Sequence, residues 1–394
     1  MALTVLIDFT GFALILPALP FWAERFGAGP LDVGLLVTTF AAGQFLLNPA
    51  LGRLSDRFGR RPVILSSLAV GVAGYTLSAL AGSLSALLAA RFVAGLGASN
   101  IGSAQAVVAD ISGPEKRATN MGIIGAAIGL GFILGPALGG MLTAFGLAAP
   151  MWAGVALTLL NFVLVLRLLP ETRHPLTKNA PAKRNGVLRV LRTPGLLRFV
   201  GINLIVTIGF AAMEAMYPLL SHSLLGWGPL QNGWALAYVG TIVVLVQAGG
   251  IGPLVRLIGE RRLLLVGLFL LAVGLALLPF SAGIALMLMS LAMLGAGLAA
   301  ASPVLSTLVS LTVAEEAQGE ALGLNQGGAA LGRIVGPLAG GAVFGSSPNL
   351  TFLLAATLVG IAVVMALPRS SARAAPVNKG LSRSLATDDS VQLR

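Results

Sequence analysis

Four ionisable side chains interrupt long apolar stretches of this sequence, and they are the first residues that could do chemistry. They are Asp8, Arg91, Glu214 and Arg333. A charged side chain near the middle of a lipid bilayer costs about 2.5 to 3.5 kcal/mol on insertion scales, so these four must pair or share a polar cavity. A carboxyl group in such a cavity can bind and release a proton, because burial disfavours its charged form and a nearby arginine favours it.

Other polar and aromatic residues recur at helical spacing around the four charges. Residues three or four positions apart share one face of a helix, so such a series predicts a lined cavity rather than scattered polar groups. The series are Asn203, Thr207, Phe210, Glu214, Tyr217 and Ser221; Arg91, Gly95, Ala98, Gly102 and Gln105; Thr4, Asp8 and Gly11; and Gln44 and Asn48. Asn325, Gln326 and Arg333 add polar side chains in another apolar stretch.

The composition indicates that membrane-spanning helices must position these residues. The chain has 394 residues, of which 56% are apolar and only 10% are charged, whereas soluble proteins have roughly 25% charged residues. Apolar runs of about 20 residues recur, and each is long enough to cross the hydrocarbon core as a helix. We predict an all-α integral membrane protein with spans at residues 2–22, 31–52, 62–81, 84–107, 119–143, 148–169, 196–221, 229–253, 262–281, 284–308, 321–344 and 348–367.

The basic residues lie almost entirely on one side of the predicted membrane. With a cytoplasmic N-terminus, 22 of the 25 lysines and arginines fall on the cytoplasmic side. This is the positive-inside distribution, so we expect a multi-pass protein of the cell (inner) membrane with both termini cytoplasmic. The net charge of +11 therefore needs no nucleic acid, and with no cysteine and two histidines we expect neither a metal nor a cofactor.

The glycine pattern of residues 119–143 recurs in residues 321–344 at an offset of 201 residues. We infer two homologous halves of six spans each, which enter the membrane in the same direction. Parallel repeats of this kind place a substrate site near the membrane midplane between the halves, which favours a carrier over a channel. The predicted domains are an N-terminal bundle at 1–169, a cytoplasmic linker at 170–195, a C-terminal bundle at 196–367 and a disordered tail at 368–394.

The stretch GRLSDRFGRR, residues 52–61, gathers five charges between two apolar spans. Anchoring at the membrane surface is one interpretation, but it explains the arginines alone. Asp56 and Arg60, four residues apart, can form a local ion pair, and Asp56 can also offer its charge to a neighbouring helix N-terminus. Gly52 and Gly59 permit a tight turn.

This stretch resembles the G-x-x-x-D-R-x-G-R-R motif of the major facilitator superfamily, through Gly52, Asp56, Arg57, Gly59, Arg60 and Arg61. The sequence DFTGFALILPALP from Asp8 is similar to the opening motif of the twelve-helix drug:proton antiporters of this family, which include tetracycline efflux pumps. Arg91 and Gly95 match their R-x-x-x-G element. The resemblance implies the major facilitator fold, with 12 transmembrane helices as two pseudo-symmetric six-helix bundles.

For residues 52–61 the resemblance implies a conformational latch. Asp56 would face the N-terminal end of the span at 321–344, while an arginine of the loop would pair with Asp110 at the end of the span at 84–107. The latch would hold the cytoplasmic side shut in the outward-facing state.

The fifth span matches the glycine signature of these antiporters, G-x8-G-x3-GP-x2-GG. Small residues at four-residue spacing allow membrane helices to approach closely, so the signature is open to two interpretations, helix packing and a marker of antiport. Its repetition in the second half favours packing. The matching residues are Gly122, Gly131, Gly135, Pro136, Gly139 and Gly140.

The resemblance and the intramembrane charges predict a proton-coupled transporter that exports small amphiphilic or cationic compounds by alternating access. Asp8 is expected to be the principal proton carrier, with Arg91 assisting it and Glu214 as a second titrating site or an anchor for cationic substrate. Structural pairing is the alternative for each of them, and Arg333 is either an anion ligand or a partner of Glu214. The expected substrate-binding residues are Phe12, Gln44, Asn48, Asn203, Phe210, Glu214, Tyr217, Trp234, Tyr238, Asn325 and Arg333.

The alternative function is export or facilitated transport of a cellular metabolite, such as a sugar or an amino acid, without drug specificity. An enzyme is not expected, because no nucleophile, metal cluster or paired catalytic carboxylates appear in the sequence. The expected partners are a small-molecule substrate, protons and the lipid bilayer, and the protein is expected to be a monomer.

Overall fold

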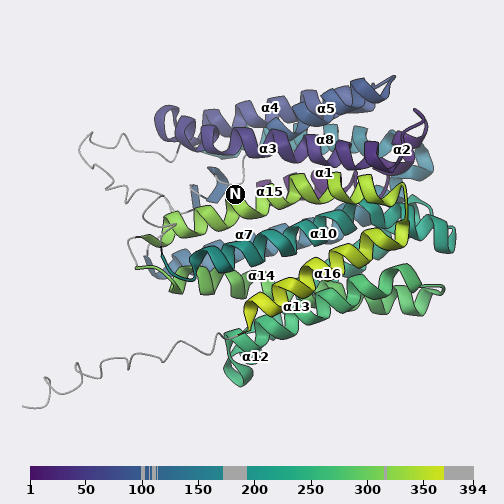
Figure 1. The fold of residues 1–394 in the computed structure, drawn as a ribbon. Helices are drawn as coiled ribbons and strands as arrows, with labels where there is room; N and C mark the ends of the chain where they lie inside the picture. The colour runs from purple at the N-terminus through teal and green to yellow at the C-terminus, as the bar shows by residue number, and fades with distance from the viewer. Residues whose placement is uncertain are drawn as a thin grey trace, which may run out of the picture.

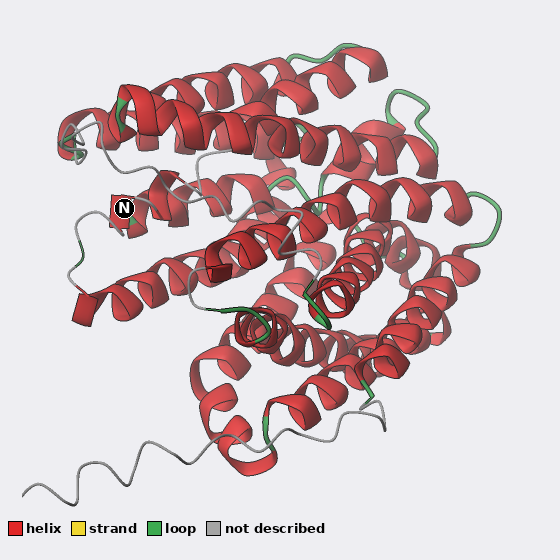
Figure 2. Cartoon of the chain, turned by 60° about the vertical axis from the view of Figure 1, so that its left-hand side comes forward, coloured by secondary structure: helices red, strands yellow, loops and turns green. Residues whose placement is uncertain are grey.

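The structure, a computed structural model, describes residues 1–98, 103–105, 107–108, 112, 114–171, 193–314 and 317–367. These ranges consist of helices joined by short turns and contain no strand (Figure 2). Within them, 10 helices are long and apolar enough to cross a membrane, and two shorter apolar helices occupy the first and fourth predicted spans. The prediction of an all-α integral membrane fold is confirmed.

The helices follow the predicted spans in order. In the described part of the first half they are α1 (Ala2–Ala13), α2 (Leu19–Glu24), α3 (Pro30–Phe58), α4 (Arg60–Ala79), α5 (Leu84–Gly97), α7 (Pro114–Leu142) and α8 (Ala149–Leu168). In the second half they are α10 (Leu196–Leu225), α11 (Pro229–Leu245), α12 (Ile251–Ile258), α13 (Glu260–Leu277), α14 (Ile284–Leu311), α15 (Gln318–Phe344) and α16 (Pro348–Ala366). A π-helical turn, η2 (Val246–Gly250), joins α11 to α12, and the 3-10 turns η1 (Thr143–Phe145) and η3 (Leu278–Phe280) follow α7 and α13.

The first predicted span, residues 2–22, is not one continuous helix. Turns at residues 14–18 separate α1 from α2. Pro17 and Pro20 explain the break, because proline has no N–H to donate to the helical ladder but is tolerated in the first turn of a new helix. One consequence is that Leu16, in the turn, lines the cavity described below.

The helices run side by side, with the two halves of the chain on opposite sides of the molecule (Figure 1). In the first half α4 packs on α5 and α8, and α1 packs on α7 and α8. In the second half α13 packs on α14 and α16, and α10 packs on α15 and α16. The halves meet where α7 packs on α11 and α15 packs on α3, so four helices form the interface between them.

The two helices that begin at this interface, α3 and α11, start in the same way. The Gly29 N–H donates to the Asp32 carboxylate at 2.9 Å, and the Gly228 N–H donates to the Gln231 side-chain oxygen at 3.0 Å. A proline occupies the first turn of each helix. Each start thus satisfies a backbone donor that the helix would leave unpaired, and the two starts are equivalent in the two halves.

Glycines allow close contact between helices within each half. A Cβ atom built on Gly135 would lie 2.8 Å from the Thr10 carbonyl oxygen of α1, and one built on Gly336 would lie 2.5 Å from the Ile208 carbonyl oxygen of α10. No side chain fits at such distances, so backbone packs on backbone, as expected where membrane helices lack a hydrophobic drive to associate. The α7 glycines against α1 and the turn that follows it are Gly131, Gly135 and Gly139, and the α15 glycines against α10 are Gly332, Gly336 and Gly340.

The halves are tightly joined at the end of the molecule where α3 and α11 begin, which we call the closed end. A Cβ atom on Gly140 of α7 would lie 2.7 Å from the Pro229 carbonyl oxygen, and one on Gly341 of α15 would lie 2.5 Å from the Pro30 carbonyl oxygen. The Thr38 hydroxyl of α3 also donates to a backbone carbonyl of α15 at 2.9 Å. These contacts cross between the halves at two pseudo-symmetric places.

The halves separate at the opposite end, where α3 ends and α4 begins, which we call the open end. Six glycines of the four interface helices lie towards this end, and no described atom comes within 4 Å of a Cβ atom built on any of them. The interface helices therefore touch along one half of their length and diverge along the other. These glycines are Gly52, Gly122, Gly125, Gly319, Gly323 and Gly327.

The arginine-rich loop at the open end is bound to its own half of the molecule. Gly59 has a φ of +102°, a conformation that favours glycine. The Glu171 carboxylate, just after α8, accepts the backbone N–H groups of Arg60 at 2.9 Å and Arg61 at 3.1 Å, which begin α4. The Arg61 guanidinium donates to the Leu166 carbonyl oxygen at 2.6 Å. Glu171 thus caps α4 and ties it to α8.

The partners predicted for the latch cannot be traced. The side chain of Asp56 and all of Asp110 lie outside the described residues, as do residues 172–192 of the linker and 368–394 of the tail. The latch, the linker, the tail and the predicted domain boundaries therefore stay predictions.

Replacement of Glu171 by glutamine should destabilise the N-terminal half. The variant loses a charged acceptor for two backbone donors at a helix N-terminus, for which we expect a cost of about 1 to 2 kcal/mol. The measurement is the thermal unfolding midpoint in detergent. The control is Glu24→Gln at the closed end, where the side chain is exposed. An equal effect of both variants would contradict the capping role.

Replacement of Gly341 by valine should open the closed end, because its Cβ atom would collide with the Pro30 carbonyl. The chain has no cysteine, so spin labels at Ser85→Cys and Ala282→Cys report the separation of the halves there. We expect the distance distribution to shift outward in Gly341→Val. It should stay unchanged in Gly345→Val, where a Cβ atom meets nothing within 4 Å. An unshifted distribution in folded Gly341→Val would show that this contact does not hold the closed end.

Candidate functional site

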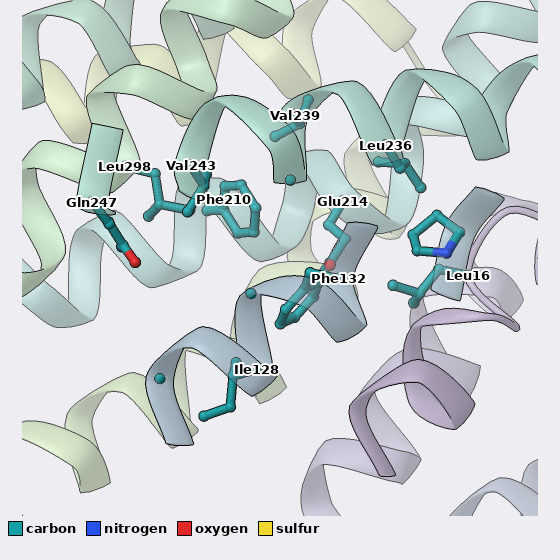
Figure 3. A pocket seen from close by; sticks show the side chains of 14 residues that line it. Leu16, Ile128, Phe132, Phe210, Glu214, Leu236, Val239, Val243, Gln247 and Leu298 are labelled. Atoms are coloured by element: carbon teal, nitrogen blue, oxygen red, sulfur yellow. The ribbon is translucent and has the colours of Figure 1, made fainter. Parts of the chain in front are cut away.

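A cavity of about 220 Å³ lies between the two halves (Figure 3). Its walls come from α7 of the first half and from α10, α11 and α14 of the second, and Leu16 in the turn after α1 completes it. Gly125 of α7 leaves space at the cavity, whereas Gly129 of α7 and Gly240 of α11 let these two helices approach each other closely beside it. The cavity therefore sits where relative movement of the halves would change its shape.

The lining of the cavity is apolar except at two places. Phe132 and Phe210 face it from opposite halves, together with leucine, isoleucine and valine side chains. The polar side chains among the lining residues are Glu214 of α10 and Gln247 of the π turn. Figure 3 shows the Glu214 carboxyl group beside the Phe132 ring, directed into the cavity. A charged carboxylate in apolar surroundings is unfavourable unless it is paired, so this group should bind a cation or a proton.

Arg333 of α15 is the charged group that acts on Glu214 from the neighbouring helix. Its side chain is exposed, and its positive charge attracts the Glu214 carboxylate electrostatically. Of the two roles left open for Arg333, the structure therefore supports a partner for Glu214, while its exposure also leaves it accessible to an anionic ligand.

Three of the predicted substrate-binding residues lie in or next to the cavity. Phe210 and Glu214 line it directly. Phe12 stacks on Phe40 with ring centroids 5.1 Å apart and meets Phe132 edge-on at 6.3 Å. Because Phe132 lines the cavity, Phe12 belongs to the aromatic cluster behind its wall.

Trp234 and Tyr238 do not line the cavity, so their assignment to substrate binding stays a prediction. Trp234 precedes and Tyr238 follows Leu236, a lining residue, by two positions. Each therefore lies roughly 200° around the axis of α11 from Leu236. Their side chains are 55% and 37% exposed. They face outward from the helix bundle, where an aromatic residue meets lipid.

Several other predicted residues connect helices instead of facing the cavity. The Asn203 amide of α10 donates to the Asn325 carbonyl oxygen of α15 at 3.1 Å, and both side chains are buried. The Gln44 amide of α3 donates to the Ala98 carbonyl oxygen at 3.1 Å. Tyr217 is completely buried in the hydrophobic core, away from the cavity lining. None of these four residues lines the cavity, and their assignment to substrate binding stays a prediction.

Asn48 is also absent from the cavity lining, and its side chain is exposed on α3. It lies in the half of α3 that runs towards the open end, beyond the cavity. A contact with substrate at this position would have to occur on the way into the cavity.

Asp8 and Arg91 belong to a separate polar cluster inside the first half. The Asn161 amide of α8 donates to the Asp8 carboxylate at 2.7 Å and to the Thr4 carbonyl oxygen at 3.0 Å. Tyr75 of α4 is buried and lies within electrostatic reach of both Asp8 and Arg91. Asp8 is half-buried and is not among the residues that line the cavity.

Arg91 is the most deeply buried charge of this cluster. Its side chain is 1% exposed, and the guanidinium lies over the Phe40 ring, 4.4 Å from the centroid. Its Nε and Nη1 atoms have no hydrogen-bond partner among the described residues. Since Phe40 stacks on Phe12 behind the cavity wall, Phe40 connects the buried arginine to the cavity.

Sequence reasoning missed Tyr75, Asn161 and Gln247. Asn161 and Gln247 each stand alone as an amide in an apolar span, which is the same signal that singled out the charged residues. Tyr75 carried no such signal, because its partners come from two other helices.

The fold and the cavity define a multi-pass membrane transporter for small molecules, built from two related halves around a central site. The sequence assigns its family: residues 1–251 and 245–387 match the Major Facilitator Superfamily. The chain belongs to this superfamily, and it is accordingly a transporter and not an enzyme.

The chain is similar over nearly its whole length to bacterial resistance proteins. It is 30% identical over 371 residues to the class C tetracycline resistance protein of Escherichia coli, covering 92% of this chain and 93% of that protein. It is 28% identical over 384 residues to multidrug resistance protein 2 of Bacillus subtilis, covering 95% and 96%. Among solved structures, a bacterial homologue of the human lysosomal transporter Spinster, inward-facing and occupied, superposes with a TM-score of 0.75 at 15% identity, covering 93% of this chain and 94% of that one.

The hydrogen bond between Asn161 and Asp8 should contribute measurably to stability. In a double-mutant cycle of Asp8→Asn and Asn161→Leu we expect a coupling energy of about 1.5 to 3 kcal/mol, as for a bond to a charged group. Denaturant unfolding in detergent measures it. Asp8→Asn combined with Asn48→Leu, at an exposed residue of α3, should be additive within about 0.5 kcal/mol. A coupling energy near zero for the first pair would show that Asn161 does not hold Asp8.

Proposed function

We propose that this protein exports small amphiphilic or cationic compounds across the cell membrane in exchange for protons, by alternating access. The observation that carries the proposal is the Glu214 carboxylate in an otherwise apolar cavity between the two halves. The cavity walls suit aromatic and alkyl groups, and the carboxylate suits a positive charge. The names of the relatives, which are tetracycline and multidrug resistance proteins, support the same class of substrate.

A sugar or amino-acid carrier is the alternative, and the lining argues against it. Recognition of a sugar needs many hydrogen-bonding groups, because each hydroxyl that loses water must find a partner. The lining residues provide one carboxylate and one amide. An amphiphile has few polar groups that need a hydrogen-bond partner in the cavity, so this lining favours an amphiphile over a sugar.

Proton coupling would use the two carboxyl groups in different halves. Glu214 anchors the cation in the cavity, and Asp8 carries the coupled proton. Asp8 accepts a hydrogen bond from the Asn161 amide, and Tyr75 lies within electrostatic reach of both Asp8 and Arg91. When the halves move, a change in these contacts alters the affinity of Asp8 for a proton.

The orientation follows from the arginines at the open end. The positive-inside rule places the open end and both termini in the cytoplasm, so the conformation described here is inward-facing. In the outward-facing conformation the open end closes, and the loop that contains Gly52, Asp56 and Arg57 would then act as the latch. One chain contains the whole cavity, which fits a monomer.

Transport in proteoliposomes under an imposed pH gradient tests the proposal. With ethidium as substrate, Asp8→Asn should abolish ethidium-driven proton flux and change ethidium binding by less than about threefold. Glu214→Gln should weaken ethidium binding by tenfold or more, about 1.4 kcal/mol, because the cation loses its counter-charge. Glu24→Gln, exposed at the closed end, is the control.

Two results would count against this function. If wild-type protein neither binds ethidium nor moves protons when ethidium is supplied, drug export is excluded. If it instead exchanges a sugar or an amino acid independently of pH, the metabolite carrier is the correct alternative.

A further inference from the structure

Gln247 is a polar group of the cavity that the proposed function does not use. It is the second polar side chain among the lining residues, after Glu214. Figure 3 shows it at one end of the cavity, beyond Val243, with its amide oxygen directed inward. Its side chain is exposed, and its amide forms no hydrogen bond with the described residues.

Gln247, in the π turn η2, continues the row of α11 residues that faces the cavity. Leu236, Gly240, Val243 and Gln247 follow one another at three or four positions, so they share one face of the helix. Glu214 lies near Leu236 and Val239 in Figure 3, at the other part of this row. Val239 and Gln247 are eight residues apart, which is roughly 12 Å along a helix axis.

The π turn at residues 246–250 prevents the row from continuing. In an uninterrupted α-helix, Ile251 would lie on the same face as Gln247. The wider turn, closed by a bond from the Ile251 N–H to the Val246 carbonyl oxygen, shifts the following residues around the axis. Ile251 and Val255 pack instead against the hydrophobic core. Gln247 therefore stands alone at the mouth of the cavity towards the open end.

The glycines of the π turn allow its backbone conformation and do not mediate contact between helices. A Cβ atom on Gly249 would meet nothing within 4 Å, and the nearest atom to one on Gly250 is 3.6 Å away. By contrast, one on Gly240, earlier in α11, would lie 3.0 Å from a carbonyl oxygen of α7. Gly249 and Gly250 thus permit the π turn, and the turn presents Gln247 to the cavity.

We propose that Gln247 is a specificity-determining residue that hydrogen-bonds a polar group of the substrate. This inference rests on the proposed cation site at Glu214 and names the substrate more closely: an elongated amphiphilic cation with a hydrogen-bonding group roughly 12 Å from its charge. An amide offers both a donor and an acceptor, so a hydroxyl, an amine or a carbonyl at that distance satisfies it. A cation with a purely apolar tail gains nothing from Gln247.

Two ligands of equal length test the inference, ω-hydroxyoctyl-trimethylammonium and nonyltrimethylammonium. The full-length protein is placed in lipid nanodiscs, and each ligand is used to displace ethidium. The measured quantity is the ratio of the two displacement constants, which cancels effects on ethidium itself. Gln247→Met, similar in length but without the amide, should shift this ratio about fivefold to tenfold against the hydroxylated ligand.

Two further variants make the result specific to the amide. Gln247→Glu keeps the length and the hydrogen-bond acceptors and should retain the preference for the hydroxylated ligand. Thr241→Val removes a hydroxyl from α11 outside the cavity, where it bonds to the helix backbone, and should leave the ratio unchanged.

The outcomes separate this inference from the proposed function. A ratio that is unchanged in Gln247→Met, or equal weakening of both ligands, overturns the role of Gln247 while the cation site at Glu214 stands. Failure of the wild-type protein to bind ethidium, or of both ligands to displace it, overturns the cation site and this inference together.

Discussion

Close contact between helix backbones is the constraint on which the rest of this structure depends. Lipid is as apolar as a leucine side chain, so burial of apolar groups does not drive membrane helices together. Contact must come from helices that approach closely enough for their backbones to touch. Glycine supplies this in α7 and α15, which pack on α1 and α10 within their own halves and on α11 and α3 across the interface.

The distribution of these contacts along the interface helices decides the shape of the molecule. At the closed end, Gly140 and Gly341 bring the halves together, while towards the open end the glycines of the same helices meet no neighbour. A contact made of backbone and glycine has no interlocked side chains to pull apart, so it can form and separate at either end. The cavity occupies the region between the joined and the separated parts.

The cost of charge in a membrane explains how the ionisable residues are arranged. Each half carries a carboxyl group and an arginine within its apolar spans. In the first half Asp8 and Arg91 both act electrostatically on Tyr75, and in the second half Arg333 acts on Glu214. The repeated architecture does not make the two pairs equivalent. Asp8 is held inside its own half by Asn161, whereas Glu214 is directed into the cavity. Two halves of common origin thus offer one enclosed carboxyl group and one that a ligand can reach.

Much of the architecture was predictable, because it depends on patterns within single segments. Span length, basic loops and the glycine repeat each concern residues close together in the chain, and they were sufficient for the membrane class, the family and the two-half organisation. Phe210 and Glu214 are one helical turn apart on α10, and this spacing explains why both line the cavity.

Which residues line the site depends on which face of each helix packs against another helix. The sequence of an apolar span does not indicate that face. Trp234 and Gln247 both lie in the α11 region, yet one faces outward and the other faces the cavity. Lipid and the protein interior are both apolar, so hydrophobicity has no contrast between the two sides of such a helix. The sequence alone therefore determined that polar residues had to be sheltered within the membrane, and only the packing of the helices decided which of them share a cavity.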